Sequence, residues 1–163
     1  MAKILKVQTG ENNPILRTKS VDVKKFDSVL QKFAKDMKAT MLKLDGLGLA
    51  APQVGENIRM VIVTMNYDSK NASVTTMINP EILSHGDEVE IAEEGCLSIP
   101  GIYGNVERPT KITVQFADLN GEKFVLKLDE LNARVVQHEI DHLNAILFVD
   151  RIKAGKKKNA VVL

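Results

Sequence analysis

The stretch "VVQHEIDHLNAIL", residues 135–147, places two of the chain's three histidines four residues apart, with Glu139 and Asp141 between them. On a helix, His138 and His142 would lie one turn apart on one face, with about 5–6 Å between their Cβ atoms. Two such imidazoles can bind one ion, and Glu139 would project toward a water on that ion, as in zinc hydrolases with an H-E-x-x-H helix. The simpler alternative is a set of core polar groups that satisfy one another by hydrogen bonds.

A catalytic tetrahedral ion takes three protein ligands and leaves one position for water, so a third ligand is needed. After His142 the chain has no histidine or glutamate, and Asp150 is the only acid. Upstream, the candidates are His85, the single cysteine Cys96, and several carboxylates. Cys96 lies in "EEGCLSIPG", where glycine lets backbone approach a ligand closely. A thiolate is the better ligand, although a lone cysteine can also be buried filler. Blue-copper sites use similar ligands but need no glutamate base.

These side chains need a scaffold, and the hydrophobic pattern predicts two helices for it. Apolar residues recur at three- and four-residue spacing from Val23 to Leu44, which indicates an amphipathic helix of about five turns, closed by Gly46. A second helix is expected from an N-cap at Asp129 to about Leu147. Its apolar positions cover much of its circumference, so we expect it to be central and buried.

Between the helices the pattern predicts strands. The segments "RMVIVTM" (59–65) and "VTTMINPEIL" (74–83) are rich in β-forming residues, and Pro80 should bend or end the second. The segment 110–128 alternates on both sides of "DLNG", which predicts a hairpin that turns at Asn120-Gly121. The predicted fold class is α+β, with antiparallel β-sheets packed around a central C-terminal helix that carries the H-E-x-x-H-type motif.

Composition restricts the class of protein. A chain of 163 residues with 44% hydrophobic and 26% charged residues indicates one globular domain, residues 1–163. A net charge of +1 gives no reason to expect specific nucleic-acid binding. The sequence shows no signal-peptide or membrane-spanning pattern, and its one cysteine suits a reducing compartment, so we expect a cytoplasmic protein without a membrane partner. Lys156 to Lys158 are most simply a solvated charge run.

A third segment, "GLGLAAPQVG" (46–55), joins small residues to Gln53, and alone it is typical of a helix C-cap followed by a tight loop. Together, "GLGLAAPQ", "EGCLS" and "QHEIDH" closely resemble the three signature motifs of the peptide deformylase family. The resemblance extends through Asn79-Pro80, "SIPGIYGNVERP" (98–109) and the "DLNG" hairpin. It covers the chain from "NPILR" near the N-terminus to "LFVDR", which ends at Arg151.

The resemblance implies a metal-dependent hydrolase that removes the formyl group from the N-terminal formylmethionine of new polypeptides and releases formate. Its metal ligands would be Cys96, His138 and His142. The ion would be one divalent metal, expected to be Fe2+, with Zn2+, Ni2+ or Co2+ as alternatives in a purified sample. A bound ion lowers the pKa of its water, so a hydroxide can attack the formyl carbon. Glu139 would take the proton and later deliver it to the departing amine.

The same resemblance assigns the other site residues. The side-chain amide of Gln53 and the backbone N–H of Leu97 would bind the developing oxyanion. The peptide would lie as an extended strand against the backbone of Leu47, Gly48 and Gly95. The methionine side chain would enter an apolar pocket, and the residues assigned to its lining and rim are Leu131, Val135, Ala92 and Arg134.

Glu94 and Arg108 are expected to pair behind the site, with two independent surface charges as the alternative. The expected partners are N-formylmethionyl nascent peptides, with a transient ribosome contact as a further candidate, and we expect a monomer. Many bacterial relatives continue into a long C-terminal helix that docks on the ribosome, whereas few residues here follow Ile152, so that docking mode is in doubt. Tyr103 also stands where relatives often carry a basic residue.

Two other functions compete with this assignment. A metallopeptidase that cleaves internal amide bonds is supported only by the short helix motif, and the missing downstream ligand argues against it. A structural metal or binding module would require four protein ligands and no role for Glu139.

Overall fold

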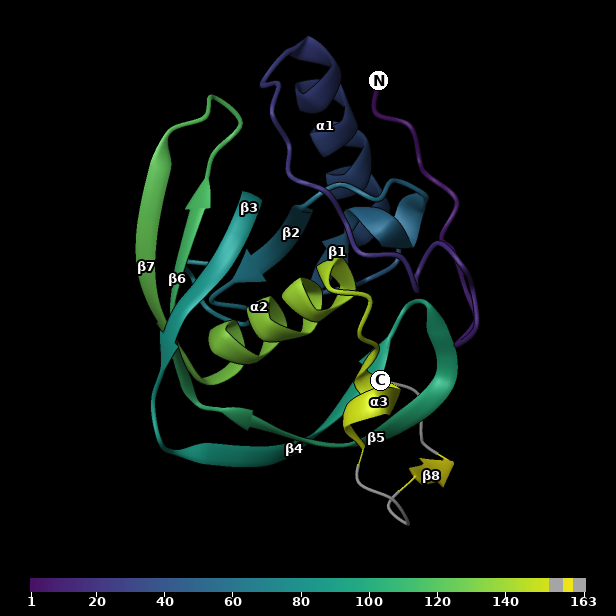
Figure 1. Cartoon of the computed structure of the whole chain (residues 1–163), viewed down its shortest axis with the longest axis vertical. Helices are drawn as coiled ribbons and strands as arrows, with labels where there is room; N and C mark the ends of the chain where they lie inside the picture. Colours follow the sequence, from purple (N-terminus) through teal and green to yellow (C-terminus); the bar gives the residue numbers. More distant parts are fainter. Residues whose placement is uncertain (153–156, 160–163) are drawn as a thin grey trace.

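The computed structural model describes residues 1–152 and 157–159 (Figure 1). Along the chain, its elements are α1 (Ser28–Lys43), β1 (Gly48–Ala50), the 3-10 helix η1 (Ala51–Val54), β2 (Met60–Met65), β3 (Ser73–His85), β4 (Val89–Cys96), β5 (Ile99–Pro109), β6 (Lys111–Ala117), β7 (Lys123–Asp129), α2 (Glu130–Leu143), α3 (Phe148–Arg151) and β8 (Lys157–Asn159).

The strands form two antiparallel sheets. The larger has the order β1-β2-β3-β6-β7, and the smaller has the order β4-β5-β8. Helix α2 contacts β1, β2, β6 and β7 of the first sheet and β5 of the second (Figure 1). The α+β class and the central position of the C-terminal helix, both predicted from the sequence, are therefore confirmed.

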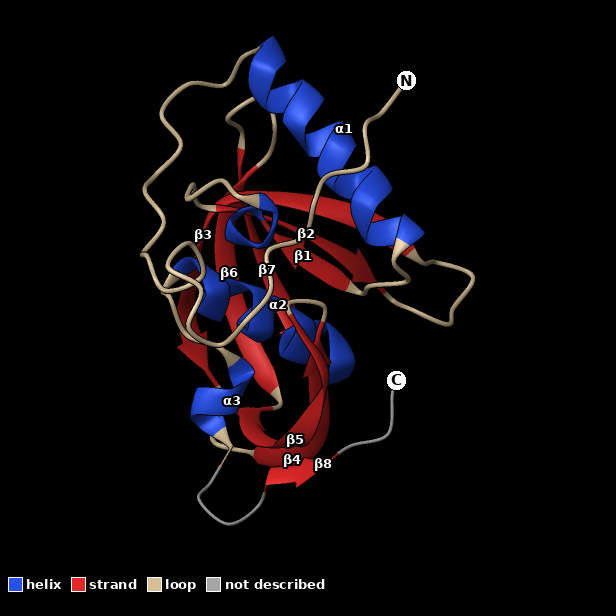
Figure 2. Ribbon diagram, turned by 90° about the vertical axis from the view of Figure 1, so that its right-hand side faces the viewer, coloured by secondary structure: helices blue, strands red, loops and turns tan. Residues whose placement is uncertain are grey.

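Strand β2 shows why the core needs a helix on each face of the large sheet. Successive side chains of a strand point to opposite faces. Met60 and Ile62 pack in the cluster that contains residues of α1, whereas Val61 and Val63 pack in the cluster that contains residues of α2. Helices α1 and α2 lie on opposite sides of the large sheet (Figure 2). All four are fully buried. The unbroken apolar run in this strand is thus explained by two covered faces.

Helix α1 begins later than the sequence pattern predicts. The expected start at Val23 is wrong, because residues 23–27 are not helical and α1 runs Ser28–Lys43. The Asp27 side chain accepts a hydrogen bond from the Leu30 backbone N–H at 3.0 Å, which makes Asp27 the N-cap. Val23 is instead fixed to the Asn79 side chain, which accepts from its N–H and donates to its C=O.

Helix α2 begins after the predicted N-cap position, Asp129, but ends four residues before Leu147. The Ile146 N–H donates to the Asp141 carbonyl, and the Ala145 N–H donates to the His142 carbonyl. Ala145 has a left-handed backbone with φ 61°. These are the two bonds of a Schellman motif, which usually has glycine at the left-handed position. Alanine at that position hid the helix end from the sequence pattern.

Some of the strands were predicted from the sequence and others were not. Strand β2 and the β6–β7 hairpin, which turns through Asn120-Gly121, lie where the pattern places them. Strand β3 continues through Pro80 with a register shift between Ile78 and Glu81, so the proline bends the strand instead of ending it. Strands β4 and β5 were not predicted, because their charged and glycine-containing sequences have low β-propensity.

The predicted charge run at Lys156–Lys158 lies partly outside the described residues. Lys156 is not described, while Lys157 and Lys158 belong to β8, which pairs with β5. Within the described part of the chain, no helix has the length and apolar character needed to cross a membrane.

Candidate metal centre

Three side chains with metal-binding atoms come together where α2 meets the β4–β5 hairpin. His138 and His142 lie one turn apart on α2, with ring centroids 5.2 Å apart. Cys96 is the last residue of β4, and its Sγ lies 3.3 Å from Nε2 of His142. One ligand atom from each of the three residues lies within 4.8 Å of the others. His85, the other upstream candidate, is exposed at the end of β3 and does not belong to this group.

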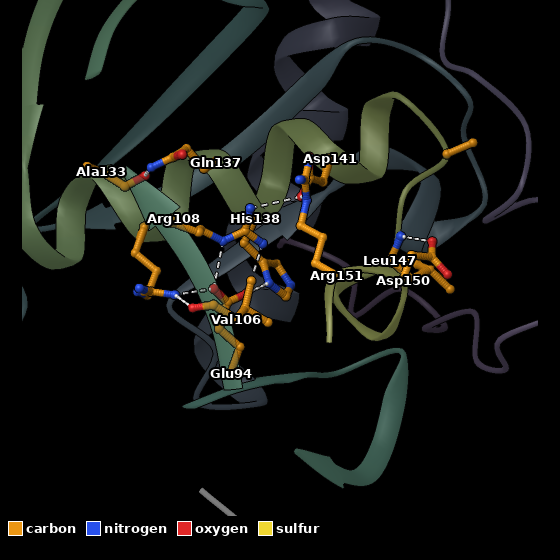
Figure 3. A network of polar contacts seen from close by, with 12 residues as sticks. Glu94, Val106, Arg108, Ala133, Gln137, His138, Asp141, Leu147, Asp150 and Arg151 are labelled. Carbon is orange, nitrogen blue, oxygen red and sulfur yellow. Dashed lines mark hydrogen bonds and ion pairs between the residues drawn. The ribbon is translucent and has the colours of Figure 1, made fainter. Parts of the chain in front are cut away.

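The surroundings of this group fit a divalent ion. Nδ1 of His138 lies 2.9 Å from Oε1 of Glu94, so its Nε2 remains to bind a metal (Figure 3). A carboxylate bonded to the far nitrogen is the usual arrangement behind a metal-binding histidine. Glu139 is 4% exposed, and among the described residues its Oε2 has no hydrogen-bond partner. Two nitrogens and one sulfur suit a divalent transition-metal ion, and the unpartnered carboxylate oxygen beside them is free to accept a proton.

The two imidazoles differ in their affinity for protons. Burial lowers the pKa of His142, and the charges of His138 and Arg108 lower it further. Burial also lowers the pKa of His138, but hydrogen bonds to Cys96 and Glu94 outweigh it and raise the pKa above its usual value. Metal binding requires neutral imidazoles. A carboxylate beside Nδ1 of His138 favours the neutral tautomer with its proton on that atom, and this tautomer presents Nε2 to a metal.

Glu139 sits in a space that only glycine leaves open. A Cβ atom added to Gly48 would lie 2.5 Å from Oε1 and 2.7 Å from Cγ of Glu139. Strand β1 therefore approaches α2 closely enough for its backbone to form the wall beside this carboxylate. Burial raises the pKa of Glu139 to about 7, despite the lowering effect of His138. Such a carboxyl group can accept and return a proton near neutral pH.

Gln53 and Leu97 border the same centre from two turns. Gln53 lies in η1, is 1% exposed, and its Nε2 lies 3.5 Å from Sγ of Cys96. Its Nε2 also donates to the Ser98 hydroxyl at 3.1 Å. Leu97 and Ser98 form the tight turn between β4 and β5, directly after Cys96. The three segments with sequence motifs thus converge on one place, although the roles of Gln53 and Leu97 remain predictions.

A buried ionic network lies behind the histidines (Figure 3). Arg108 donates to both carboxylate oxygens of Glu94, at 2.6 and 2.9 Å, which confirms the predicted pair. Its Nη1 donates to Asp141 at 2.9 Å, and Arg134 donates to Glu94 at 2.7 Å. Burial would raise the pKa of Glu94, but His138 and Arg108 outweigh it and hold the pKa far below its usual range. The network therefore keeps Glu94 ionised against His138.

Asp141, for which the sequence suggested no partner, joins this network to the C-terminal side of the fold. It accepts from Nε and Nη2 of Arg151 at 2.5 and 2.7 Å, as well as from Arg108. Arg151 lies in α3, after the chain has turned away from α2. The sequence held one signal, opposite charges ten residues apart, but the turn at Ala145 that brings them together was not recognised.

The residues assigned to substrate lie in or directly before β1, in β4 and in α2. Strand β1, with Gly48, and strand β4, with Gly95, are edge strands of their sheets in the described part of the chain. Leu47 directly precedes β1, and its carbonyl accepts from the Thr64 N–H. Of the residues assigned to the methionine pocket, Leu131 is 44% exposed, Val135 and Ala92 are half-buried, and Arg134 is buried with its guanidinium on Glu94. Their pocket assignment remains a prediction.

An α+β fold that places two histidines and a buried glutamate of one central helix beside a cysteine from β4 has the architecture of a mononuclear metallohydrolase. The polypeptide deformylase family model matches residues 1–158. A peptide deformylase of Prochlorococcus marinus (strain AS9601) is 41% identical over 169 residues, which cover 99% of this chain and 84% of the relative. The chain belongs to the peptide deformylase family, which removes the formyl group from N-terminal formylmethionine.

Solved structures agree in fold. The peptide deformylase of Thermotoga maritima superposes with a TM-score of 0.86 at 41% identity, covering 92% of this chain and 98% of that one. A class I type b peptide deformylase from Acinetobacter baumannii, with bound Met-Ala-Ser, gives a TM-score of 0.86 at 39% identity, covering 93% of this chain and all of that one. Enzymes of this family are metalloenzymes, and the Cys–His–His group is where this chain could bind a metal.

Proposed function

We propose that Cys96, His138 and His142 hold one divalent ion and that Glu139 carries the proton during deformylation. The observation that carries this proposal is the convergence of the three ligand atoms beside a buried glutamate with an unpartnered oxygen. When bound, such an ion acts as a Lewis acid that lowers the pKa of a coordinated water and polarises a carbonyl oxygen. We expect Fe2+ as the ion, and the same donors also suit Zn2+, Ni2+ and Co2+.

Glu139 has the properties of a general base that later acts as an acid. Its burial and its pKa of about 7 let the carboxylate take a proton from the attacking water near neutral pH. The protonated form then gives that proton to the nitrogen of the departing amine. The backbone of Gly48 lies directly against the Glu139 carboxylate, so the carboxylate has little freedom to turn toward β1 between the two steps.

Gln53 and Leu97 are proposed as the donors to the oxyanion. The Gln53 amide is buried and has two N–H bonds, of which Ser98 accepts one. Leu97 follows the ligand Cys96, so its backbone N–H belongs to the same tight turn. Donors fixed in advance around a developing negative charge commonly supply the largest part of catalysis.

The substrate is proposed to bind as an extended peptide between two sheet edges. Leu47 precedes the edge strand β1, Gly48 begins it, and Gly95 lies in the edge strand β4. The proposed peptide would pair as an added strand with these two edges. The methionine side chain would then lie among Ala92, Leu131 and Val135. The relative from Acinetobacter baumannii with bound Met-Ala-Ser supports a peptide that extends beyond its methionine. We place the chain in the cytoplasm as a monomeric single domain, residues 1–163. Its proposed partners are N-formylmethionyl nascent peptides, and transient ribosome contact is a further candidate.

Incubation of metal-loaded protein with formyl-Met-Ala-Ser tests the assignment. Deformylation releases formate and leaves Met-Ala-Ser, whereas a metallopeptidase would cleave an internal amide and leave the formyl group in place. Glu139→Ala should lower kcat by about 100- to 10,000-fold with metal content unchanged, because only the proton carrier is lost. The exposed Glu93 of β4 offers a matched control, and Glu93→Ala should keep full activity. Full deformylation by Glu139→Ala would refute the proposed mechanism.

A further inference from the structure

The side-chain amide of Gln53 makes three hydrogen bonds, of which one is a long contact of 3.5 Å from Nε2 to Sγ of Cys96 and the other two fix its orientation. Its Oε1 accepts a hydrogen bond from the Ala50 backbone N–H at 2.9 Å, and its Nε2 donates to Oγ of Ser98 at 3.1 Å. Gln53 is 1% exposed and Ser98 is fully buried. Neither contact can therefore be replaced by bulk water when it is lost.

Each contact has a separate effect. If the amide of Gln53 turned over, its NH2 group would face the N–H of Ala50, and two donors would meet without an acceptor. The bond from Ala50 therefore decides which side of the amide carries the nitrogen. The hydroxyl of Ser98 then accepts a hydrogen bond from one N–H of the Gln53 amide. Nε2 of Gln53 also lies 3.5 Å from Sγ of Cys96. The second N–H is thereby directed toward the metal centre.

The turns that carry the two side chains are held together by other bonds. The Gln8 N–H donates to the Gln53 carbonyl at 2.7 Å, and the Gly10 N–H donates to the Ser98 carbonyl at 2.9 Å. Residues 8–10 thus join η1 to the turn between β4 and β5 through backbone alone. Loss of the Ser98 hydroxyl leaves these bonds in place, so its effect should be confined to the Gln53 amide.

We propose that Ser98 is a positioning residue that aims the Gln53 amide at the oxyanion of the reaction. This inference rests on the proposed function, in which Gln53 is an oxyanion donor. Ser98 does not touch the reacting atoms, and it acts by holding one N–H of Gln53 so that the other is fixed before charge develops. A donor that must reorient during the reaction stabilises the transition state less than one already in place.

Steady-state kinetics of Ser98→Ala, with metal content measured in parallel, test this role. A neutral hydrogen bond is worth enough to predict a fall in kcat of about 3- to 10-fold, with KM and metal content unchanged. Ser98→Thr keeps the hydroxyl and should restore kcat. Ser20 offers a matched control, because its buried hydroxyl has no partner in the described part of the chain. Ser20→Ala should retain the wild-type kcat, and Ser98→Ala equal to it would overturn the proposal.

A double-mutant cycle separates this inference from the proposed function. Gln53→Ala should lower kcat by about 100- to 1,000-fold, and adding Ser98→Ala should then cost nothing more. An undiminished effect of Ser98→Ala in the Gln53→Ala background overturns the positioning role and leaves the oxyanion assignment intact. A wild-type kcat for Gln53→Ala overturns the oxyanion assignment itself.

Metal-free protein gives a readout that does not depend on activity. The side-chain NH2 of Gln53 can be identified in nitrogen–proton NMR spectra by its loss in Gln53→Ala. In the wild-type protein its protons should exchange slowly with solvent, because the amide is buried and bonded. Faster exchange in Ser98→Ala, with the Ser20→Ala spectrum unchanged, supports the proposal, and equal exchange rates in all three proteins contradict it.

Discussion

The metal centre has a charged side and a neutral side, and the two hold their residues by different chemistry. The charged side consists of Glu94, Arg108, Arg134, Asp141 and Arg151, which are joined by hydrogen-bonded ion pairs. The neutral side consists of Gly48, Gln53, Leu97 and Ser98, where close approach and neutral hydrogen bonds set the geometry. Glu94 of the charged side lies 2.9 Å from Nδ1 of the proposed ligand His138. Gln53 of the neutral side makes only a long 3.5 Å contact with the proposed ligand Cys96, and it is proposed to face the space where a substrate carbonyl would develop charge.

The difference suggests that the charged side positions a metal ligand and that the neutral side contributes to catalysis. Buried ions are costly to desolvate, and they persist where each is paired and hydrogen-bonded, so the charged side is rigid. Rigidity suits a ligand such as His138, whose position must not depend on substrate. Neutral donors carry a smaller desolvation cost and can remain in place before negative charge develops on a substrate carbonyl. We therefore expect changes on the charged side to affect folding and metal retention, and changes on the neutral side to affect kcat.

The largest effect on folding should come from Arg108→Met. Arg108 is 3% exposed and bonds Glu94 and Asp141, so its removal leaves two buried carboxylates with fewer partners. Breaking a buried pair commonly costs about 3–5 kcal/mol, and we expect that loss in the free energy of unfolding. Chemical denaturation of metal-free protein measures it. Arg17→Met is the matched control, because the Arg17–Asp150 pair is 30% and 37% exposed and should contribute no more than about 1 kcal/mol. Equal losses for the two variants would remove the distinction.

On the neutral side, Gly48→Ala should affect the rate and not the metal. The added Cβ would lie 2.5 Å from Oε1 of Glu139, so the carboxylate must move. Misplacement of a catalytic group by about 1 Å can cost about 100-fold in kcat. Gly86→Ala is the control, because its Cβ would meet Lys111 only at an ordinary 3.5 Å. Formate release should fall for Gly48→Ala alone, with metal content equal in both variants. A wild-type rate for Gly48→Ala would show that Glu139 is not confined as described.

The smallest effect concerns an ion pair outside both sides. The Arg17 guanidinium holds the pKa of Asp150 below its usual value, so the ionised carboxylate stabilises the folded state above about pH 4. That stabilisation is lost as pH falls through the lowered pKa. Asp150→Asn should therefore reduce stability at pH 7 by at most about 1 kcal/mol, less at high salt. The difference from wild type should shrink toward pH 2 in denaturation experiments. A difference independent of pH would show that the charge of Asp150 is not what stabilises the folded state.

The sequence was sufficient to predict those features whose position in the fold depends on one short pattern of residues. The spacing of His138 and His142 placed both imidazoles on one helical face, and Asn120-Gly121 located the hairpin turn. Cys96 could be chosen as the third residue because the chain has no histidine or glutamate after His142 and a thiolate is a better ligand than His85. For Glu94 and Arg108, fourteen residues apart, the sequence allowed either an ion pair or two independent surface charges. The hairpin of β4 and β5 brings them together as a pair.

What the sequence did not yield depends on contacts between distant segments. Strands β4 and β5 have low β-propensity, and their pairing is supported by side chains such as Tyr103, whose ring fills the space left by Gly95. The partner of Asp141 depends on the turn at Ala145, where alanine takes a conformation usually taken by glycine. The contact of Ser98 with Gln53 joins residues 45 positions apart, and no local pattern predicts it.

Competition of a chelator for bound metal, measured on Glu94→Gln and Gln53→Ala, tests the division between the two sides most directly. Loss of the carboxylate behind a metal-binding histidine typically weakens metal affinity about 10- to 100-fold, and we expect that result for Glu94→Gln. Gln53→Ala should lose kcat with a smaller loss of metal affinity than Glu94→Gln, because it removes only a long, neutral contact with Cys96. A Glu94→Gln protein that retains metal as tightly as wild type, or a Gln53→Ala protein that releases it as readily as Glu94→Gln, would contradict the account.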